Sequence, residues 1–104
     1  MTSTIGANTN TNDTAVLSAG IAVNNTTSTT LVTTTAMSIR VVMTNDGNQD
    51  VWIKFQAASV DNDKKGFILY KGSAADILLA PNMYVGEISG IAANGNSTIH
   101  ITSY

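Results

Sequence analysis

The stretch SIRVVMTNDGNQDVWIKFQ, residues 38–56, decides the fold of this chain. Apolar residues recur at every second position over residues 38–44 and again over residues 51–56. This period of two predicts β-strands. Residues 45–48 between them contain Asp-Gly, one of the strongest short-range signals for a β-hairpin. The stretch therefore predicts two strands joined by a tight turn.

Outward from this stretch, short strands and turns repeat along the chain. Turn signals such as Pro81-Asn82 and Asn94-Gly95 separate apolar runs at spacings of about eight to twelve residues. No segment has the spacing of a convincing amphipathic helix. About eight short strands predict an all-β fold, and we favour an antiparallel two-sheet sandwich, jelly-roll or Ig-like, over a small barrel. The further predicted strands are residues 16–23, 29–35, 67–71, 76–79, 83–92 and 97–103.

The composition describes one domain with few charges. Of 104 residues, 43% are hydrophobic and 12% are charged, and the net charge is −2. This length holds a single core, and the charge balance leaves no electrostatic footprint for nucleic acid. No run approaches the roughly 20 apolar residues that cross a membrane, and the polar start lacks the features of a signal peptide. We expect a sandwich domain at residues 14–104, preceded by an extended polar arm at residues 1–13, in a soluble protein made in a cytoplasm.

The first part of the chain is almost free of ionisable side chains. Over residues 1–39 only Asp13 can carry a charge, and most of the others are Thr, Asn, Ser, Ala and Val. A partner can cover such a surface, because hydroxyl and amide groups find hydrogen bonds without the desolvation cost of an ion. The composition also fits a disordered leader, and both interpretations stay open. In the first, the arm reaches about 40 Å and binds the partner through Thr2, Thr4, Ile5, Asn8, Thr9 and Asn10.

Residues with catalytic or metal-binding chemistry are sparse. There is no cysteine and a single histidine, His100, so no cluster of thiolates or imidazoles can form. His100 lies in a predicted strand, where a solvated or hydrogen-bonded side chain is a better interpretation than a general base. Asp61 and Asp63 imitate the start of a calcium loop, but Lys65 and Gly72 stand where ligands are needed. We expect no enzyme activity, no catalytic residue, no metal and no cofactor.

Trp52 is the strongest candidate for binding. In the predicted strand it shares one side with Lys54 and Gln56, whereas Phe55 belongs to the opposite side. An exposed Trp beside Lys and Tyr is typical of an interface anchor or a sugar-stacking surface. The alternative places Trp52 in the core or between packed subunits. Further aromatic candidates of this kind are Tyr70, Tyr84 and Tyr104.

Strand and turn motifs fill the second half of the chain. They are IRVVMTN (39–45), VWIKF (51–55), ILLAPN (77–82), YVGEISGIA (84–92), Gly95 and the strand 98–102. In this half, from Ser38 onward, the chain resembles small structural proteins of tailed bacteriophages, especially capsid decoration and head-fibre proteins. No functional residue can be carried over from such a family, because the shared motifs describe a sandwich and not a site.

The resemblance implies a virion protein that binds the outer capsid surface in many copies and stabilises it. Its partners are then the major capsid protein and other copies of itself, in a homo-oligomer such as a trimer, without nucleic acid or membrane. Two other functions stay open. One is a carbohydrate- or receptor-binding adhesin module that uses exposed aromatics, and the other is a free-standing cytoplasmic sandwich.

Overall fold

The computed structural model describes residues 17–79 and 84–104. These residues form eight β-strands and, in the described ranges, no helix. The strands are rich in Val, Ile and Thr, whose branched side chains favour the pleated, half-buried surface of a sheet. Their bounds are β2 (Leu17–Asn24), β3 (Thr29–Thr34), β4 (Arg40–Asn45), β5 (Val51–Lys54), β6 (Phe67–Leu69), β7 (Ala74–Leu78), β8 (Gly86–Ala92) and β9 (Asn96–Ser103).

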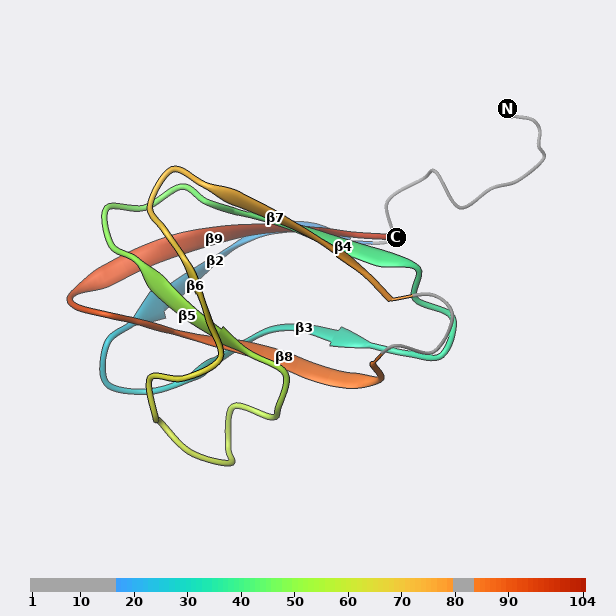
Figure 1. Ribbon diagram of the computed structural model, residues 1–104, viewed down its shortest axis with the longest axis horizontal. Coiled ribbons are helices and arrows are strands. Elements are labelled where there is room, and N and C mark those ends of the chain that lie inside the picture. The colour runs from blue at the N-terminus through green and yellow to red at the C-terminus, as the bar shows by residue number, and fades with distance from the viewer. Residues whose placement is uncertain (1–16, 80–83) are drawn as a thin grey trace.

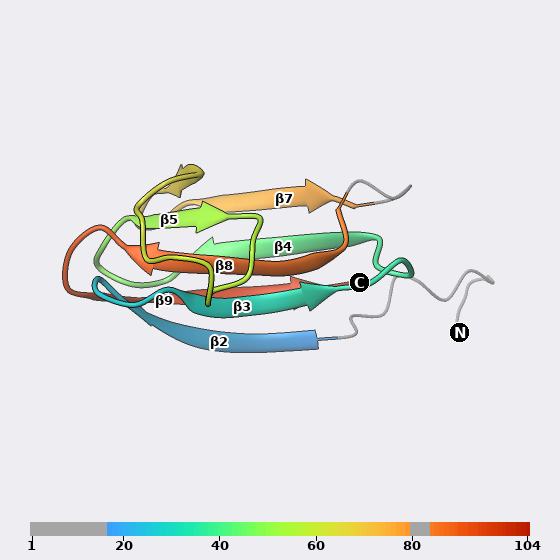
Figure 2. The ribbon, with the colours of Figure 1, turned by 90° about the horizontal axis from the view of Figure 1, so that it is seen from below.

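The strands form two antiparallel sheets that pack face to face (Figure 1 and Figure 2). Sheet I has the order β2-β9-β4-β7, and sheet II has the order β3-β8-β5-β6. Every connection except β5–β6 carries the chain from one sheet to the other. Eight strands wound in this way form a jelly roll. The expected all-β, two-sheet sandwich is confirmed, and its topology is the jelly roll and not the Ig-like arrangement.

The hairpin predicted at residues 45–48 is wrong. β4 and β5 lie in different sheets, so the connection is a corner that crosses the sandwich. A type I′ hairpin turn needs a positive φ at both central residues, and Gly47 does not belong to the glycines with positive φ. The Asp46 N–H donates instead to the carbonyl oxygen of Thr98 in β9, at 2.9 Å. The turn predicted at Asn94-Gly95 is also a corner, because it joins β8 of sheet II to β9 of sheet I.

Strand ends differ from the prediction by a few residues. β5 ends at Lys54, two residues before the predicted end, and Phe55 beyond it is 43% exposed. β7 begins at Ala74, two residues before the predicted start. The turn predicted at Pro81-Asn82 lies outside the described residues.

The core lies between the sheets and is aliphatic. In β9, Ile99 and Ile101 are fully buried, whereas His100 between them is exposed on the other face of sheet I. Val41 and Met43 are buried in the same way in β4. Burial of these side chains is the main stabilising contribution to the fold. The remaining members of the core are Val23, Leu31, Val32, Val51, Ile53, Leu69, Leu79, Ile88 and Ala92.

The outer face of sheet II is partly covered by the chain itself. The loop at residues 55–66, between β5 and β6, passes over β8 toward β3 (Figure 2). Ser89 and Ile91 in β8 are fully buried, and Ile91 does not belong to the core between the sheets. The loop is attached by the Ser89 hydroxyl, which donates to the Gln56 carbonyl at 3.0 Å, and by the Ser28 N–H, which donates to Asn62 at 2.9 Å. The loop therefore covers β8 on the outer face of sheet II, whereas Trp52 and Ile68 beside it stay half-buried.

Candidate interaction surfaces

The outer face of sheet I is open and carries mostly small side chains. β2 contributes the exposed Ser18, Gly20 and Ala22, and β9 contributes the exposed Thr98 and His100. Their paired positions place them on one side of the sheet, since Gly20 lies opposite His100 and Ala22 lies opposite Thr98. The pairing extends the surface across β4 and β7. We call this surface the open face, and it consists of Ser18, Gly20, Ala22, Arg40, Val42, Thr44, Ala74, Asp76, Leu78, Thr98, His100 and Thr102.

Permanent charge on the open face itself lies on its β4–β7 side, and the exposed Asp46 of the β4–β5 corner stands at one end of the face. On the β4–β7 side, Arg40 and Asp76 lie 3.8 Å apart, and both side chains are largely exposed. The Arg40 guanidinium also lies over the Tyr104 ring, 4.8 Å from its centroid. On the β2–β9 side, His100 is the one ionisable side chain of the open face. This half of the face can therefore be covered without the desolvation of a permanent charge.

His100 has the surroundings of a surface residue. Its Nε2 atom lies 3.2 Å from the Ser18 hydroxyl across the β2–β9 pair. Within the described residues, no group of three His, Cys, Asp or Glu side chains is placed to hold a metal ion. The arrangement allows the imidazole to hydrogen-bond to Ser18 or to a partner.

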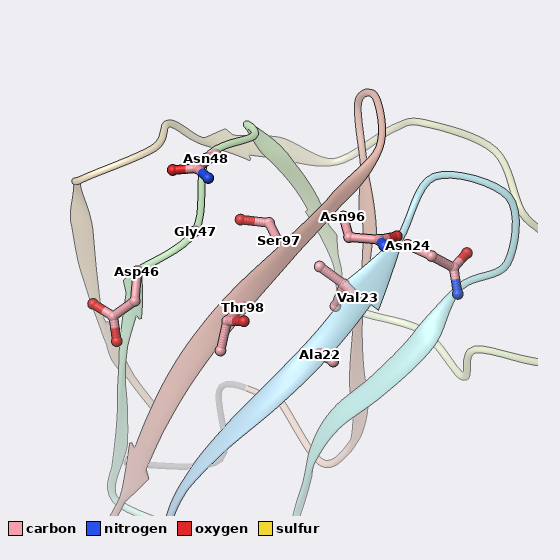
Figure 3. Close-up of a pocket in the computed structure, with 9 residues that line it drawn as sticks. All are labelled: Ala22, Val23, Asn24, Asp46, Gly47, Asn48, Asn96, Ser97 and Thr98. Carbon is pink, nitrogen blue, oxygen red and sulfur yellow. The ribbon is translucent and has the colours of Figure 1, made fainter.

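A polar hollow lies at one end of the open face. Its volume is about 540 Å³, and three segments meet in it: β2, the β4–β5 corner and β9 (Figure 3). Amide and hydroxyl groups dominate its lining, with Asp46 as the single carboxylate. Such groups can hydrogen-bond to a partner's backbone or to neutral polar side chains. The lining residues are Ala22, Val23, Asn24, Asp46, Gly47, Asn48, Asn96, Ser97 and Thr98.

Asn45 holds the corner beside this hollow. Its side chain is fully buried and makes four hydrogen bonds. Nδ2 donates to the carbonyl oxygens of Gln49 and Leu69 at 2.7 and 2.9 Å. Oδ1 accepts from the Gly47 N–H at 3.1 Å and from the Ser97 hydroxyl at 2.7 Å. The sequence pattern placed Asn45 at a turn and did not reveal this role, because two of its four partners, Leu69 and Ser97, lie far away along the chain.

The predicted exposure of Lys54 is wrong. Its side chain is 3% exposed, because the β5–β6 loop folds over it. Its Nζ atom donates to Asp61 through both the carbonyl oxygen and Oδ1, each at 2.9 Å, and to the Asp63 carbonyl at 3.4 Å. These oxygens belong to the segment that imitates a calcium loop. The Lys54 ammonium group binds them, as a calcium ion would in a true calcium loop. Lys54 therefore stabilises the loop and is not available as a partner contact.

Asp61 is the centre of the β5–β6 loop. Its carboxylate accepts hydrogen bonds from Lys54, from Lys65 at 2.8 Å, from Gln56 at 3.2 Å and from the Asp63 N–H at 3.1 Å. The hydrogen bond from Lys54, and next the one from Lys65, hold the pKa of the Asp61 carboxyl well below its ordinary value. The hydrogen bond with Asp61 raises the pKa of Lys65 in turn. The ionised carboxylate thus ties the loop together.

The aromatic candidates do not form one surface. Trp52 is half-buried, and it pairs with Ile68 and Ile91 on sheet II. Tyr70 is 59% exposed at the end of β6. Tyr84 is half-buried before β8, where its hydroxyl donates to the Glu87 carbonyl at 2.6 Å. The half-buried Tyr104 lies under Arg40.

An aromatic group that the sequence analysis did not single out lies at the end of β5. The Phe55 ring packs at 5.1 Å from the Tyr84 ring and at 6.4 Å, edge to face, from the Phe67 ring. A largely apolar hollow of about 450 Å³ lies between Phe55, Phe67 and Lys65. The alternating pattern placed Phe55 on the side opposite Trp52 and did not indicate that its ring is exposed in an aromatic group.

The predicted arm lies outside the described residues. This holds for residues 1–13 and for the arm contacts expected there, Thr2, Thr4, Ile5, Asn8, Thr9 and Asn10. Among the described residues, no helix is long and apolar enough to cross a membrane. No protein-family model, curated protein or solved structure matches this chain.

Proposed function

We propose that this chain is a structural virion protein that decorates the outer capsid surface of a tailed phage in many copies and stabilises the capsid. Its partners are the major capsid protein and other copies of itself. The open face is the observation behind the proposal, because it is a broad sheet surface with mostly small side chains, and its permanent charges lie on the β4–β7 side. The resemblance that the strand and turn motifs of residues 38–104 suggest, to decoration and head-fibre proteins, points to the same function.

The two sheets of the sandwich differ in a way that suits this function. Sheet II is partly covered by its own β5–β6 loop, whereas sheet I presents Gly20, Ala22 and Thr98 directly to the surroundings. Small side chains let a partner approach the sheet closely. The hydrogen bonds that hydroxyl groups lose with water can be replaced by hydrogen bonds with the partner, and no permanent charge has to be buried there. Sheet I is therefore the side that a capsid can cover.

The size of the open face explains why many copies are needed. Four strands at about 4.8 Å spacing, with about seven residues each, give a face of about 400 Å². Two partners would then bury about 800 Å² in total, which is below the area of about 1,200 Å² at which stable interfaces begin. A single contact of this size is weak, but copies linked to one another bind with avidity.

The proposal is tested by binding of the purified chain to capsids assembled from the major capsid protein of the same phage. Thr98→Arg places a charged, bulky side chain on the open face, and we expect at least tenfold weaker binding in a sedimentation assay. Ser59→Arg makes the same change on the exposed β5–β6 loop and should bind as the unchanged chain does. Failure of the unchanged chain to bind, or equal binding by Thr98→Arg, would contradict the proposal.

We further propose that the polar arm adds to capsid binding. Deletion of residues 1–12 removes an uncharged segment that can reach about 40 Å when extended. The truncated chain should keep its circular dichroism spectrum and bind capsids more weakly than the full chain. Full affinity after the deletion would rule out the arm and leave the open face as the contact.

A further inference from the structure

Among the described strands, the two sheets have four edges, and three of these edge strands are protected against pairing with another strand. β3 contains a register shift between Thr30 and Val32, which is a β-bulge or irregularity. β6 is only three residues long. β7 carries the exposed, charged Asp76. Bulges, short length and charge are the devices by which natural proteins prevent edge-to-edge association.

The fourth edge, β2, has none of these devices. It is eight residues long, LSAGIAVN, without proline or charge. Its register with β9 is unbroken from Leu17, opposite Ser103, to Asn24, opposite Asn96. In the described part of the chain, no strand borders its other side. Among the described edge strands, β2 is therefore the one best suited to pair with a further strand.

The hydrogen bonds of β9 show which backbone groups of β2 point outward. The Thr98 carbonyl accepts from Asp46 on the β4 side of β9, so Thr98 does not bond to Ala22 opposite it on β2. Antiparallel pairs alternate between bonded and non-bonded positions. The N–H and C=O groups of Ser18, Gly20 and Ala22 consequently point away from β9, at the free edge.

We propose that β2 pairs antiparallel with β2 of a second copy of this chain around a two-fold axis at Gly20. The two sheets I then form one continuous eight-stranded sheet, and their open faces lie side by side. Ser18, Gly20 and Ala22 supply the hydrogen-bonding groups on both copies. A second copy is the partner that this edge fits, because an uncharged strand creates no repulsion when it meets itself.

The axis at Gly20 gives a register in which large and small side chains meet. Leu17 lies opposite Val23 of the partner copy, and Ala19 lies opposite Ile21. On the open face, Ser18 lies opposite Ala22, and the glycines meet on the axis. The second strand also covers apolar surface at the edge, since Leu17 is 38% exposed and Ile21 is only partly buried. A shift by one residue would place outer-face residues opposite core-facing ones.

This pair is a dimer, whereas the phage resemblance implied a homo-oligomer such as a trimer. The inference does not rest on the proposed function, because it concerns two copies of the isolated chain. A chain that dimerises and does not bind capsids would overturn only the proposed function. A monomeric chain that binds capsids would overturn only the inference.

The test uses a single cysteine in a chain that has none of its own. A Cβ atom at Gly20 would meet Thr98 Cγ2 at 3.7 Å and His100 Nδ1 at 4.0 Å, which are ordinary contacts, so Gly20→Cys fits the fold. On the axis, two Cα atoms of a bonded antiparallel pair lie about 5.5 Å apart, a distance that a disulfide spans. Under mild oxidation we expect Gly20→Cys to form a covalent dimer. Ala74→Cys, which is also exposed and lies on the β7 edge, is the matched control and should form at least tenfold less covalent dimer.

A second measurement uses the unoxidised chain. By sedimentation equilibrium, the unchanged chain should have twice the mass of one copy. Ala22→Pro removes an N–H at the free edge, where β9 does not use it, so this variant should keep its circular dichroism spectrum and have the mass of one copy. A monomeric unchanged chain, or equal cross-linking of Gly20→Cys and Ala74→Cys, would overturn the inference. If Ala22→Pro does not fold, the cysteine pair still decides it.

Discussion

Asn45 shows how one buried polar side chain can fix the relation of two sheets. It stands at the end of β4 in sheet I, yet its amide donates to the Leu69 carbonyl in β6 of sheet II. It also receives the Ser97 hydroxyl from β9. A buried amide with all its hydrogen bonds satisfied specifies one arrangement, since any other would leave a polar group without a partner.

Replacement of this side chain should be costly. Asn45→Ala leaves two carbonyl oxygens, one N–H and the Ser97 hydroxyl without their partner in a buried place. Because each unsatisfied buried group costs about 1–3 kcal/mol, and water can reach some of them at the corner, we expect a loss of about 3 kcal/mol in the free energy of unfolding. Urea titration measures it. Asn48→Ala, on the exposed side of the same corner, should change it by less than about 0.5 kcal/mol.

The Asp61 carboxylate makes the β5–β6 loop sensitive to acid. Its folded pKa lies below the ordinary 3.8, so its contribution to stability is complete above that value and is lost as the pH falls from 3.8 through the folded pKa. Asp61→Asn removes this contribution at every pH. The variant should unfold at lower urea concentration than the unchanged chain at about pH 7, and the difference should shrink with acidification below 3.8.

Unfolding at several pH values, followed by the fluorescence of Trp52, checks this expectation. Asp63→Asn is the control, because the Asp63 carboxylate makes no ion pair within the described residues. It should lower the unfolding midpoint less than Asp61→Asn does. A difference between the unchanged chain and Asp61→Asn that persists undiminished far below 3.8 would contradict the assigned role of this carboxylate.

The β4–β5 corner depends on close approach between segments. A Cβ atom on Gly47 would overlap the Ser97 hydroxyl and lie 2.6 Å from the Thr98 backbone nitrogen. Gly47→Ala should therefore push the corner away from β9 and lower the free energy of unfolding by about 2 kcal/mol, as overpacking does. Gly20→Ala is the matched control in β2, since its Cβ meets only ordinary contacts. Equal urea midpoints for the two variants would show that the corner moves freely.

The elements were predictable from the sequence, but their partners were not. Alternation of apolar residues located all eight strands within a few residues, because it records burial on one face. It could not show that Asp46-Gly47 turns between sheets and not within one, since the same residues serve both kinds of turn. It also misplaced Lys54, because alternation does not reveal that a distant loop covers the outer face of a sheet.

The two sheets of the whole molecule are interwoven. Except for β5 and β6, strands that follow one another in the chain lie in opposite sheets. Neither sheet therefore consists of one continuous segment that could fold by itself. Sheet I cannot unfold without removal of the apolar cover from sheet II, and the molecule should unfold in one cooperative step.

A destabilising substitution in one sheet should therefore lower the unfolding midpoint that is measured in the other sheet. Ile101→Ala removes a fully buried side chain from β9 of sheet I, at an expected cost of about 3 kcal/mol. Trp52, the single tryptophan, lies in β5 of sheet II. The unfolding transitions followed by its fluorescence and by the circular dichroism of the whole chain should shift to the same lower urea midpoint. The same shift is expected for Ile88→Ala in sheet II itself.

Val85→Ala, at an exposed position, is the control and should leave both midpoints unchanged. If Ile101→Ala moved the circular dichroism transition and left that of Trp52 behind, the sheets would be separate folding units and the interwoven topology would not govern stability.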